Sequence, residues 1–478
     1  MTNEAAGGQA PFLALVSALA LALFVGHAVW LSPAVGLNAG DEVEYHLLAK
    51  ALAQGKGLTY DGHELTSFRP PLLPAYLAAA YRVFGPSPVA GRVAVAALCA
   101  TLPLLLFWTA LVYLGDLRCA RLSAILALVY WPFVRYSGQL MSDLPFVCLL
   151  LAFLIPFGLM LRDLTRVGPA VAAGAALGLA VLCRPTVLLL PIWLLPLLLA
   201  VRERKLLLRN VAALSLTAGL VVAPWSLRNY AVHGELVLVS TQGGYALWQH
   251  HNELPPDGTV GTNPAIQDRL HRTMPELLER VRSGEPADEV FREILGWRGK
   301  GYVEWLGEDG AALREEFRGL NEPQTDRLLK RKALEAIRAH PGRFLRKVAK
   351  SCLKFWEPYG DPDVRSGTRR YNLAYGLVAP LGAIGTVSLL RKRRFPWAFA
   401  LVAANFNALV ALFYYEERYR LPVEPCLIVL ATVGIVALSA MRRSVSVAVV
   451  SALVLANGAI LLWGESVMEA LREFVHAL

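Results

Sequence analysis

The chain has 478 residues, of which 55% are hydrophobic and only 18% are charged. Soluble proteins carry about 25% charged residues, and a mean hydropathy of +0.45 indicates apolar stretches too long for soluble domains. These values exclude a disordered chain, a collagen-like repeat and a nucleic-acid-binding domain. They predict a polytopic, all-α membrane protein. The net charge of +10 fits cytoplasmic loops rich in Lys and Arg, which also attract anionic lipid.

The N-terminal segment predicts a first membrane-spanning helix. Residues 11–31 are apolar, and about 20 residues suffice to cross a hydrocarbon core of about 30 Å. We expect this helix to be retained, because residues 1–10 lack the Lys or Arg of a signal peptide. The six cysteines are widely scattered, and their spacing indicates neither a disulfide framework nor a zinc site.

Two long polar stretches divide the rest of the chain, and each is followed by further apolar spans, which bring the predicted total to about 11. The polar stretches cover residues 32–86 and 225–371. The further spans lie near 88–114, 121–136, 143–161, 168–183, 185–200, 207–224, 373–390, 397–414, 421–440 and 444–463.

The distribution of basic residues predicts the topology, because short cytoplasmic loops collect Lys and Arg. With a cytoplasmic N-terminus, every second loop is basic, from Arg118 and Arg121 to the run at 391–394 and the pair at 442–443. A single helix over 168–200 would place the run at 391–394 outside, so we expect a hairpin there. Both polar stretches then face outward.

We therefore expect three parts. Residues 1–224 form a transmembrane catalytic module with an outer loop at 32–87, residues 225–371 form a mainly helical outer domain, and residues 372–478 form C-terminal transmembrane helices.

The first outer stretch predicts a helix along the membrane surface. Apolar residues at 47, 48, 51 and 52 give it an amphipathic pattern, and Gly55 and Gly57 end it. Asp41 and Glu42 stand at its N-terminal end, where the helix dipole favours negative charge. An ordinary helix cap would explain these acids; catalysis is the alternative.

Two further outward features favour catalysis. Arg69 precedes a Pro-Pro turn, which would hold its guanidinium near the membrane boundary in a position that suits a phosphate. Asp143 begins an apolar span, and an acid at such a site is a functional hypothesis. Asp41 and Asp143 could hold a divalent metal or divide the roles of base and orienting group.

Several arginines stand at outward helix ends, against the positive-inside tendency. A bound anionic headgroup would explain them, since the guanidinium fork matches phosphate oxygens. Internal ion pairing, for example between Glu417 and Arg420, is the alternative. These arginines are Arg184, Arg228, Arg418 and Arg420.

Other motifs give weaker evidence about function. Gly174 and Gly178 form a GxxxG pattern that indicates helix packing. His250 and His251 are adjacent without a metal-binding motif around them, and no P-loop or GxGxxG supports a nucleotide cofactor.

Taken together, the motifs resemble bacterial protein-mannosyltransferase-like and aminoarabinose-transferase-like enzymes, relatives of glycosyltransferase family 39 with the GT-C fold. The resemblance covers nearly the whole chain. The matching strings are Gly40-Asp41-Glu42, Gln54-Gly55-Lys56-Gly57, Arg69-Pro70-Pro71-Leu72-Leu73-Pro74, Phe84-Gly85, Arg92, Ser142-Asp143-Leu144-Pro145, Arg184-Pro185-Thr186, Pro224-Trp225-Ser226-Leu227-Arg228-Asn229-Tyr230, Gly243-Gly244-Tyr245-Ala246-Leu247-Trp248, His340-Pro341, Phe355-Trp356 and Glu417-Arg418-Tyr419-Arg420-Leu421-Pro422.

The resemblance implies transfer of a sugar from a polyprenyl-phosphate carrier to an acceptor hydroxyl at the outer face of a bacterial plasma (inner) membrane. It gives Asp41, with Glu42 beside it, the role of base or metal ligand, and Asp143 that of the second acid, where many relatives carry Glu. Arg69 stands where the aminoarabinose enzymes have Lys and would bind the carrier phosphate. Lipid, glycan and protein acceptors all remain open.

From these residues we predict direct displacement with inversion, because no second nucleophile is evident. The candidate catalytic residues are Asp41, Glu42 and Asp143, with Asp41 and Asp143 as metal ligands. The candidate carrier-binding residues are Tyr45, Lys56, Arg69, Arg184, Arg228 and Arg420. A secondary transporter or flippase is the main alternative class, although no internal repeat supports it; a noncatalytic scaffold is a third.

Overall fold

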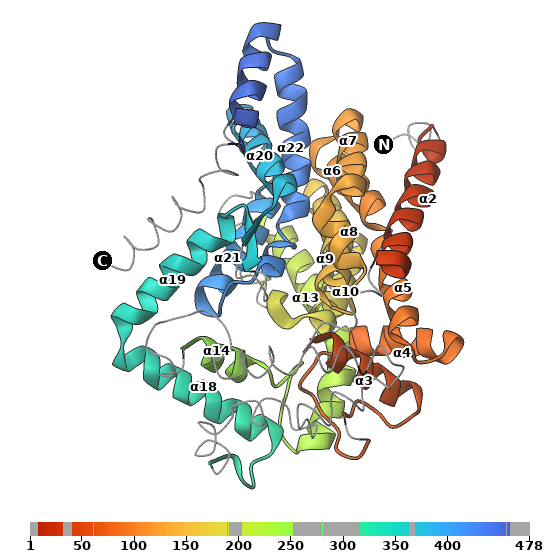
Figure 1. The fold of residues 1–478 in the computed structure, drawn as a ribbon, viewed down its shortest axis with the longest axis vertical. Coiled ribbons are helices and arrows are strands. Elements are labelled where there is room, and N and C mark those ends of the chain that lie inside the picture. Colours follow the sequence, from red (N-terminus) through yellow and green to blue (C-terminus); the bar gives the residue numbers. More distant parts are fainter. Residues whose placement is uncertain are drawn as a thin grey trace.

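A computed structural model describes residues 8–31, 41–60, 62–188, 190, 203–251, 280, 316–362, 369–455 and 457–458. Most of these residues are helical, and the helices run mostly lengthwise (Figure 1). The N-terminal half contains α2 (Ala10–Gly26), continued by the π-helical turn η1 (His27–Leu31), then α3 (Asp41–Ala53), α4 (Leu72–Phe84), α5 (Pro88–Cys99), α6 (Leu102–Leu114), α7 (Leu117–Val129), α8 (Trp131–Ser137), α9 (Asp143–Arg162), α10 (Gly168–Cys183), the short turn η3 (Pro185–Val187) and α13 (Arg204–His233).

The second half begins with three helices beside the lower part of the bundle in Figure 1 and returns to apolar helices. Its elements are α14 (Gly243–His251), α18 (Glu322–Ala339), α19 (Pro341–Trp356), the antiparallel strands β1 (Tyr359–Pro362) and β2 (Arg369–Tyr371), α20 (Leu373–Arg391), α21 (Trp397–Leu412), the 3-10 turn η6 (Glu417–Arg420) and α22 (Glu424–Ser439).

Five of the described helices are long and apolar enough to cross a membrane, and the bent pair α7 and α8 gives up to six. They are Ala10–Trp30, Pro88–Leu114, Asp143–Arg162, Arg204–His233 and Leu373–Arg391. Shorter apolar helices include α10, α21, α22 and a helix over Arg443–Leu455. The all-α membrane class is confirmed, whereas the number of about 11 spans stays a prediction.

Two predicted boundaries can be compared with the helices. The chain leaves the helix after Cys183 and Arg184 is extended, with φ −147° and ψ 121°, so α10 does not continue as one helix through 200. Most of the expected span at 185–200 lies outside the described residues. The predicted boundary at residue 224 falls inside α13, which continues to His233.

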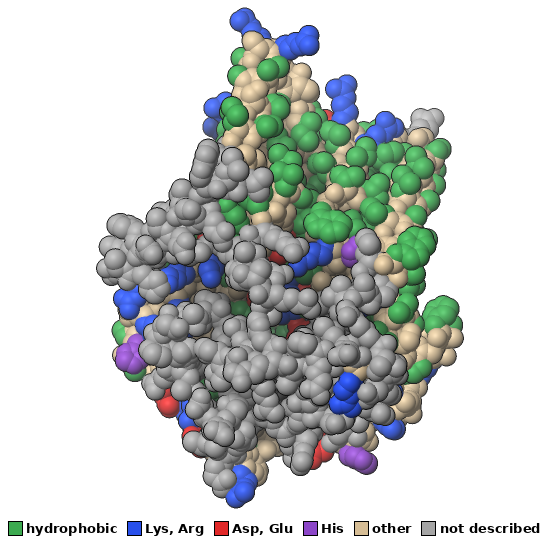
Figure 2. Space-filling view, in the orientation of Figure 1, with side chains coloured by type: hydrophobic (Ala, Val, Ile, Leu, Met, Phe, Trp, Pro, Cys, Tyr) green, Lys and Arg blue, Asp and Glu red, His purple; other side chains and the backbone are tan. Residues whose placement is uncertain are grey.

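The bundle has a basic end and a site end. The helix α9 begins at Asp143 at the site end and finishes at Arg162 at the basic end, so these two residues lie at opposite ends of the bundle. Figure 2 shows Lys and Arg side chains at the upper tip, above a wide band of exposed hydrophobic side chains. α3, α4, α14 and α18 lie at the lower end in Figure 1.

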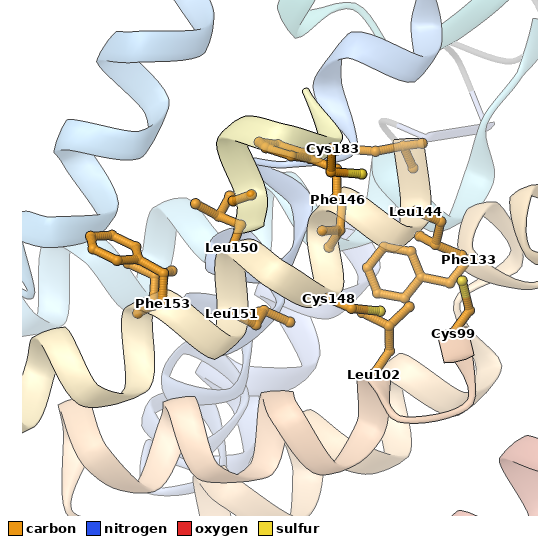
Figure 3. Close-up of a cluster of buried hydrophobic side chains, with 14 of the residues drawn as sticks. Cys99, Leu102, Phe133, Leu144, Phe146, Cys148, Leu150, Leu151, Phe153 and Cys183 are labelled. Carbon is orange, nitrogen blue, oxygen red and sulfur yellow. The ribbon is translucent and has the colours of Figure 1, made fainter. Parts of the chain in front are cut away.

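Close helix packing and a buried aromatic core fix the site end. A Cβ at Gly174 would lie 2.3 Å from the Leu214 carbonyl oxygen, so the GxxxG face packs α10 directly on α13, as predicted. Around the first turns of α9, Phe133, Phe146 and Cys148 pack together with Cys183 and neighbouring side chains (Figure 3). A core this dense holds the first turn of α9, and therefore Asp143, in place.

Candidate active site

The helix α3 carries the first acid of the site and ends where the glycine pattern predicted. Gly55 and Gly57 have φ values of 78° and 82°, a conformation that glycine adopts at little cost. The helix is buried on nearly all sides, from Glu42 through Ala49. The amphipathic pattern does not correspond to one buried and one exposed face, because polar and apolar side chains of α3 are buried alike and the helix packs on α4. Its placement along the membrane surface stays a prediction.

Asp41 lies between two arginines from distant parts of the chain. One carboxylate oxygen accepts from Nη2 of Arg69, and the other accepts from Nη1 of Arg418 at 2.5 Å. Nε of Arg69 also donates to Glu44 at 2.5 Å. The Arg69 guanidinium lies over the Tyr45 ring, 5.4 Å from its centre. These contacts lock Arg69 in one orientation.

Asp143 forms the second half of the cluster. It accepts a hydrogen bond from Nη1 of Arg184, and its other oxygen lies 3.9 Å from Nη1 of Arg418. Arg418 therefore bridges the two acids, and its Nε donates to Glu416. The Tyr45 hydroxyl donates to Ser142, the residue before Asp143, at 3.0 Å, which ties the two acid-bearing segments together.

Exposure separates an accessible part of the cluster from a buried part. The side chain of Asp41 is 25% exposed, whereas that of Asp143 is only 3% exposed. Arg184 and Arg418 are each partly exposed beside the Tyr419 ring. A ligand would therefore reach Asp41 and the two guanidiniums before it reached Asp143.

The charges of the cluster set the protonation state of Asp41. Burial by itself would raise the pKa of this carboxyl, but the guanidiniums of Arg69 and Arg418 hold that pKa well below its usual value of 3.8. Asp41 is therefore ionised at neutral pH, and its negative charge is shared between two cations.

The arrangement does not fit the predicted metal bridge between Asp41 and Asp143. Both Asp41 oxygens accept from guanidiniums, and Arg418 occupies the space between the acids. Among the described residues, no group of three or more His, Cys, Asp or Glu side chains is placed to hold a metal ion. A hard divalent cation needs several oxygen ligands, and the cations here compete with it for the same oxygens.

Glu42 stands in the interior, not in the cluster. Its side chain is 1% exposed; it pairs with Arg92 at 3.4 Å and accepts from the Leu140 backbone N–H at 2.7 Å. As the residue after Asp41 on a helix, it projects about 100° away around the axis. The catalytic role predicted for Glu42 does not fit this position; the residue ties α3 to α5 and to the loop before α9.

Arg420 is also internal, and the carrier-binding role predicted for it does not fit its complete burial. It is fully buried, pairs with Glu424 at 3.0 Å, lies 3.7 Å from the centre of the Tyr375 ring and donates to the Glu357 carbonyl oxygen at 2.5 Å. The internal-pairing alternative named the wrong partner, because Glu417 pairs with Arg135 at 3.2 Å.

Two further predicted carrier-binding residues lie away from the acids. Arg228 donates to the Thr66 carbonyl oxygen and to the Ser67 hydroxyl, both at 2.9 Å, and so supports the loop that leads to Arg69. Lys56 is exposed in the turn after α3. Neither side chain is hydrogen-bonded to Asp41 or Asp143 in the described part of the chain. Tyr45, in contrast, lies within the cluster.

The predicted histidine pair belongs to a structural contact. Nε2 of His251 lies 2.8 Å from the Leu412 carbonyl oxygen, which joins α14 to the end of α21. Burial, with a smaller contribution from the neighbouring His251, lowers the pKa of His250 to about 2, so His250 is neutral.

Arg418 and Glu416 belong to the cluster, although neither is among the candidate site residues predicted from the sequence. Arg418 was one of four outward arginines, and the structure selects it over Arg420. Sequence spacing does not separate Arg418 from Arg420, because both lie in the 3-10 turn η6, where the period-2 alternation of a strand does not apply. The contact of Arg418 with Glu416, the residue before this turn, is visible only in the structure.

Comparison with known proteins agrees with the motifs. A family model described as dolichyl-phosphate-mannose-protein mannosyltransferase matches residues 68–227. This range contains Arg69, Asp143 and Arg184 but neither Asp41 nor Arg418. A comparison with curated protein sequences gives no match.

The archaeal oligosaccharyltransferase AglB from Archaeoglobus fulgidus, in complex with an inhibitory peptide and a dolichol-phosphate, is similar in fold: TM-score 0.52, 15% identity, 91% of this chain and 51% of that chain. A second A. fulgidus oligosaccharyltransferase structure, with Zn and sulfate, gives TM-score 0.50 at 14% identity over 94% of this chain and 51% of the other. ArnT from Cupriavidus metallidurans, bound to undecaprenyl phosphate, gives a TM-score of 0.41 at 17% identity. The match covers 90% of this chain and 79% of that chain.

The chain thus spans about half the length of the oligosaccharyltransferases that it matches. At these identities the likeness shows the fold. The resemblance to the protein-mannosyltransferase-like family is confirmed, and the chain has the GT-C fold of membrane glycosyltransferases.

Proposed function

We propose that this protein is a membrane glycosyltransferase that moves a sugar from a polyprenyl-phosphate carrier to an acceptor hydroxyl of a lipid, glycan or protein. One observation carries the proposal: Asp41 and Asp143 lie together with Arg69, Arg184 and Arg418 at one end of an apolar helix bundle. The family match and the dolichol-phosphate in the AglB complex support a lipid-phosphate donor. Basic loops at the opposite end support a site on the outer face of the plasma membrane.

The cations of the cluster suit the departing phosphate. When the bond between the anomeric carbon and the phosphate oxygen breaks, its electron pair goes to the polyprenyl phosphate, which gains negative charge. Fixed guanidiniums that bind this charge more strongly as it grows lower the barrier. Arg184 and Arg418 are the partly exposed cations and are our candidates for direct contact.

Asp41 is our candidate base. The acceptor hydroxyl loses its proton to the Asp41 carboxylate as its oxygen attacks the anomeric carbon, and the polyprenyl phosphate leaves from the opposite side with the electron pair of the broken bond. A single displacement inverts the anomeric configuration. Asp143 would hold Arg184 and Arg418 in place, because it is nearly buried and contacts both.

Because Arg418 contacts Asp41 and would also contact the donor phosphate, donor binding would change the basicity of Asp41. In the free protein, Arg418 and Arg69 stabilise the Asp41 carboxylate and make it a weak base. A carrier phosphate that binds Arg418 would take part of that interaction, so the pKa of Asp41 would rise toward its usual value. Donor binding would then strengthen the base.

This coupling predicts two different pH profiles. For kcat/KM, which reports the free enzyme, we expect the acid limb that belongs to Asp41 to lie below about pH 4, because its pKa is depressed. For kcat, which reports the donor complex, we expect the limb at a higher pH. The two profiles would be measured in liposomes of fixed composition. Limbs at the same pH, or a kcat/KM limb near pH 6, would contradict the coupling.

Replacement of Asp41 tests the proposed function. Purified protein in lipid is supplied with a panel of polyprenyl-phosphate sugars and candidate acceptors, and release of free polyprenyl phosphate is followed. We expect release by the native chain and a loss of about 100-fold in kcat for Asp41→Asn, the scale of a lost general base. The matched control is Asp163→Asn, an exposed carboxyl at the opposite end of α9, which should keep full activity.

Folded protein that releases nothing from any donor would contradict the glycosyltransferase proposal and favour the transporter class. Equal rates for Asp41→Asn and Asp163→Asn would remove Asp41 from the mechanism. A product with retained anomeric configuration would exclude the single displacement.

A further inference from the structure

The helix α19 has an unusual composition for its place in the fold. Its 16 residues include five cations and no acid: Arg343, Arg346, Lys347, Lys350 and Lys354. In Figure 1 it lies along the outer edge of the molecule, between α18 and the strand pair that leads into the apolar helix α20. A helix so charged is expected at a polyanionic or solvent surface.

One face of α19 packs on the protein. Lys347, Ser351 and Phe355, at spacings of four residues, are buried. The Lys347 ammonium donates to the His250 carbonyl oxygen, and the Phe355 ring meets Tyr415 edge to face at 6.3 Å. The helix also contacts α21, whose last residue, Leu412, accepts the bond from His251. α19 is therefore held at the level where α21 ends.

The opposite face carries an exposed apolar stripe. Leu345 is 64% exposed and Trp356 is 43% exposed, with Ala349 and Leu353 exposed between them. The steps of four, four and three residues place all four side chains on one side of the helix. These four residues form the α19 stripe. Large apolar side chains so arranged are costly in water unless something covers them.

A row of cations runs beside the stripe. Arg346, Lys350 and Lys354 each follow a stripe residue, so they lie about 100° further around the helix and form a parallel line. Figure 2 shows Lys and Arg side chains at this edge of the molecule, below the hydrophobic band of the bundle. An apolar stripe flanked by Lys and Arg is the pattern of helices that lie in a membrane interface.

We propose that α19 is an interfacial helix whose stripe inserts into the bilayer surface at the site end and whose cation row binds anionic lipid headgroups. The charge of the row selects anionic over zwitterionic lipid, and the level of α19 at the end of α21 places the stripe at headgroup depth. This binding does not require the proposed transferase activity.

Lipid binding by α19 would also affect the active site, because one hydrogen bond connects the end of α19 to η6. At the end of α19, the Glu357 carbonyl oxygen accepts from Arg420, two residues after Arg418. A helix held at the lipid surface therefore holds one end of η6, the turn that carries Arg418.

The test places a polarity-sensitive fluorophore on the stripe of the full chain in lipid nanodiscs. Ala349→Cys is labelled in a Cys352→Ser background, because the other five cysteines are buried. Leu353→Cys reports the same stripe if the first variant does not fold. The matched control is Leu334→Cys on α18, a position that is also exposed. Quenching by a lipid with a nitroxide near its headgroup is measured in two kinds of nanodisc. One contains phosphatidylcholine alone, and the other contains in addition about 30% phosphatidylglycerol, an anionic content on the order of that of biological membranes.

We expect the stripe label, but not the α18 label, to be quenched by the nitroxide lipid, with quenching at least about twofold stronger in the anionic nanodiscs. Arg346→Gln together with Lys354→Gln should abolish the difference between the two lipids while the quenching itself remains. A stripe label quenched only by an aqueous quencher would overturn the proposal. So would a label shielded from both quenchers, which would mean a protein partner, and so would quenching that is independent of lipid charge.

Discussion

Arg418→Gln is expected to lower kcat by about 10³-fold, since removal of a single preorganised charge donor costs about 10² to 10³ and this arginine touches both acids. It bridges Asp41 at 2.5 Å and Asp143 at 3.9 Å. The substitution would remove a donor to the departing phosphate and would leave the two carboxylates without the cation between them. We expect the loss in kcat rather than in KM, because the interaction grows as the phosphate gains charge.

The measurement is release of polyprenyl phosphate under saturating donor, with thermal unfolding recorded for every variant. Arg442→Gln, an exposed arginine at the opposite end of the bundle, is the matched control and should behave as the native chain. Arg418→Lys should recover only part of the rate, because an ammonium lacks the fork that contacts Asp41 and Glu416 together. A native rate for Arg418→Gln would refute the bridging role.

Glu42→Ala is expected to lower the free energy of unfolding by about 3 to 5 kcal/mol, the cost of breaking a buried ion pair. The Arg92 guanidinium, only 3% exposed, would remain charged and lose its carboxylate partner, and the Leu140 N–H would lose its acceptor. The loss should appear as a lower midpoint of thermal unfolding in detergent micelles of fixed composition.

A paired substitution distinguishes this electrostatic cost from simple loss of volume. Glu42→Leu with Arg92→Met removes both charges and should recover most of the stability, because apolar replacement of a buried pair is often neutral. Asp163→Asn again serves as the exposed acid control. If Glu42→Ala unfolds like the control, the pair does not stabilise the fold; if Glu42→Ala keeps its midpoint but loses activity, the residue acts in catalysis.

The sequence was informative about elements whose cause is local. Runs of apolar residues and the glycines after α3 act within a few residues, so the membrane class and the end of α3 were predictable. The family resemblance likewise depends on short strings. The helix α4, from Leu72 to Phe84, was not predicted, because its residues fall in the stretch predicted to be a polar loop. Sequence periodicity failed at α3 itself, because it shows which residues are apolar but not that neighbouring helices enclose the polar face as well.

The roles of individual charges were decided by tertiary structure. Asp41 and Glu42 are adjacent in the chain, yet one meets Arg418, 377 residues away, and the other meets Arg92 inside the bundle. Arg418 and Arg420 are two residues apart, yet one faces the acids and the other is fully buried against Tyr375.

Composition and motifs therefore determined by themselves that the chain is a helical membrane protein and that a set of acids and arginines gathers at one end of it. Only the tertiary structure decided which acid pairs with which arginine. The physical reason is that an ion pair depends on distances of a few ångström between groups brought together by the packing of whole helices, and neither the spacing of residues nor their type contains those distances.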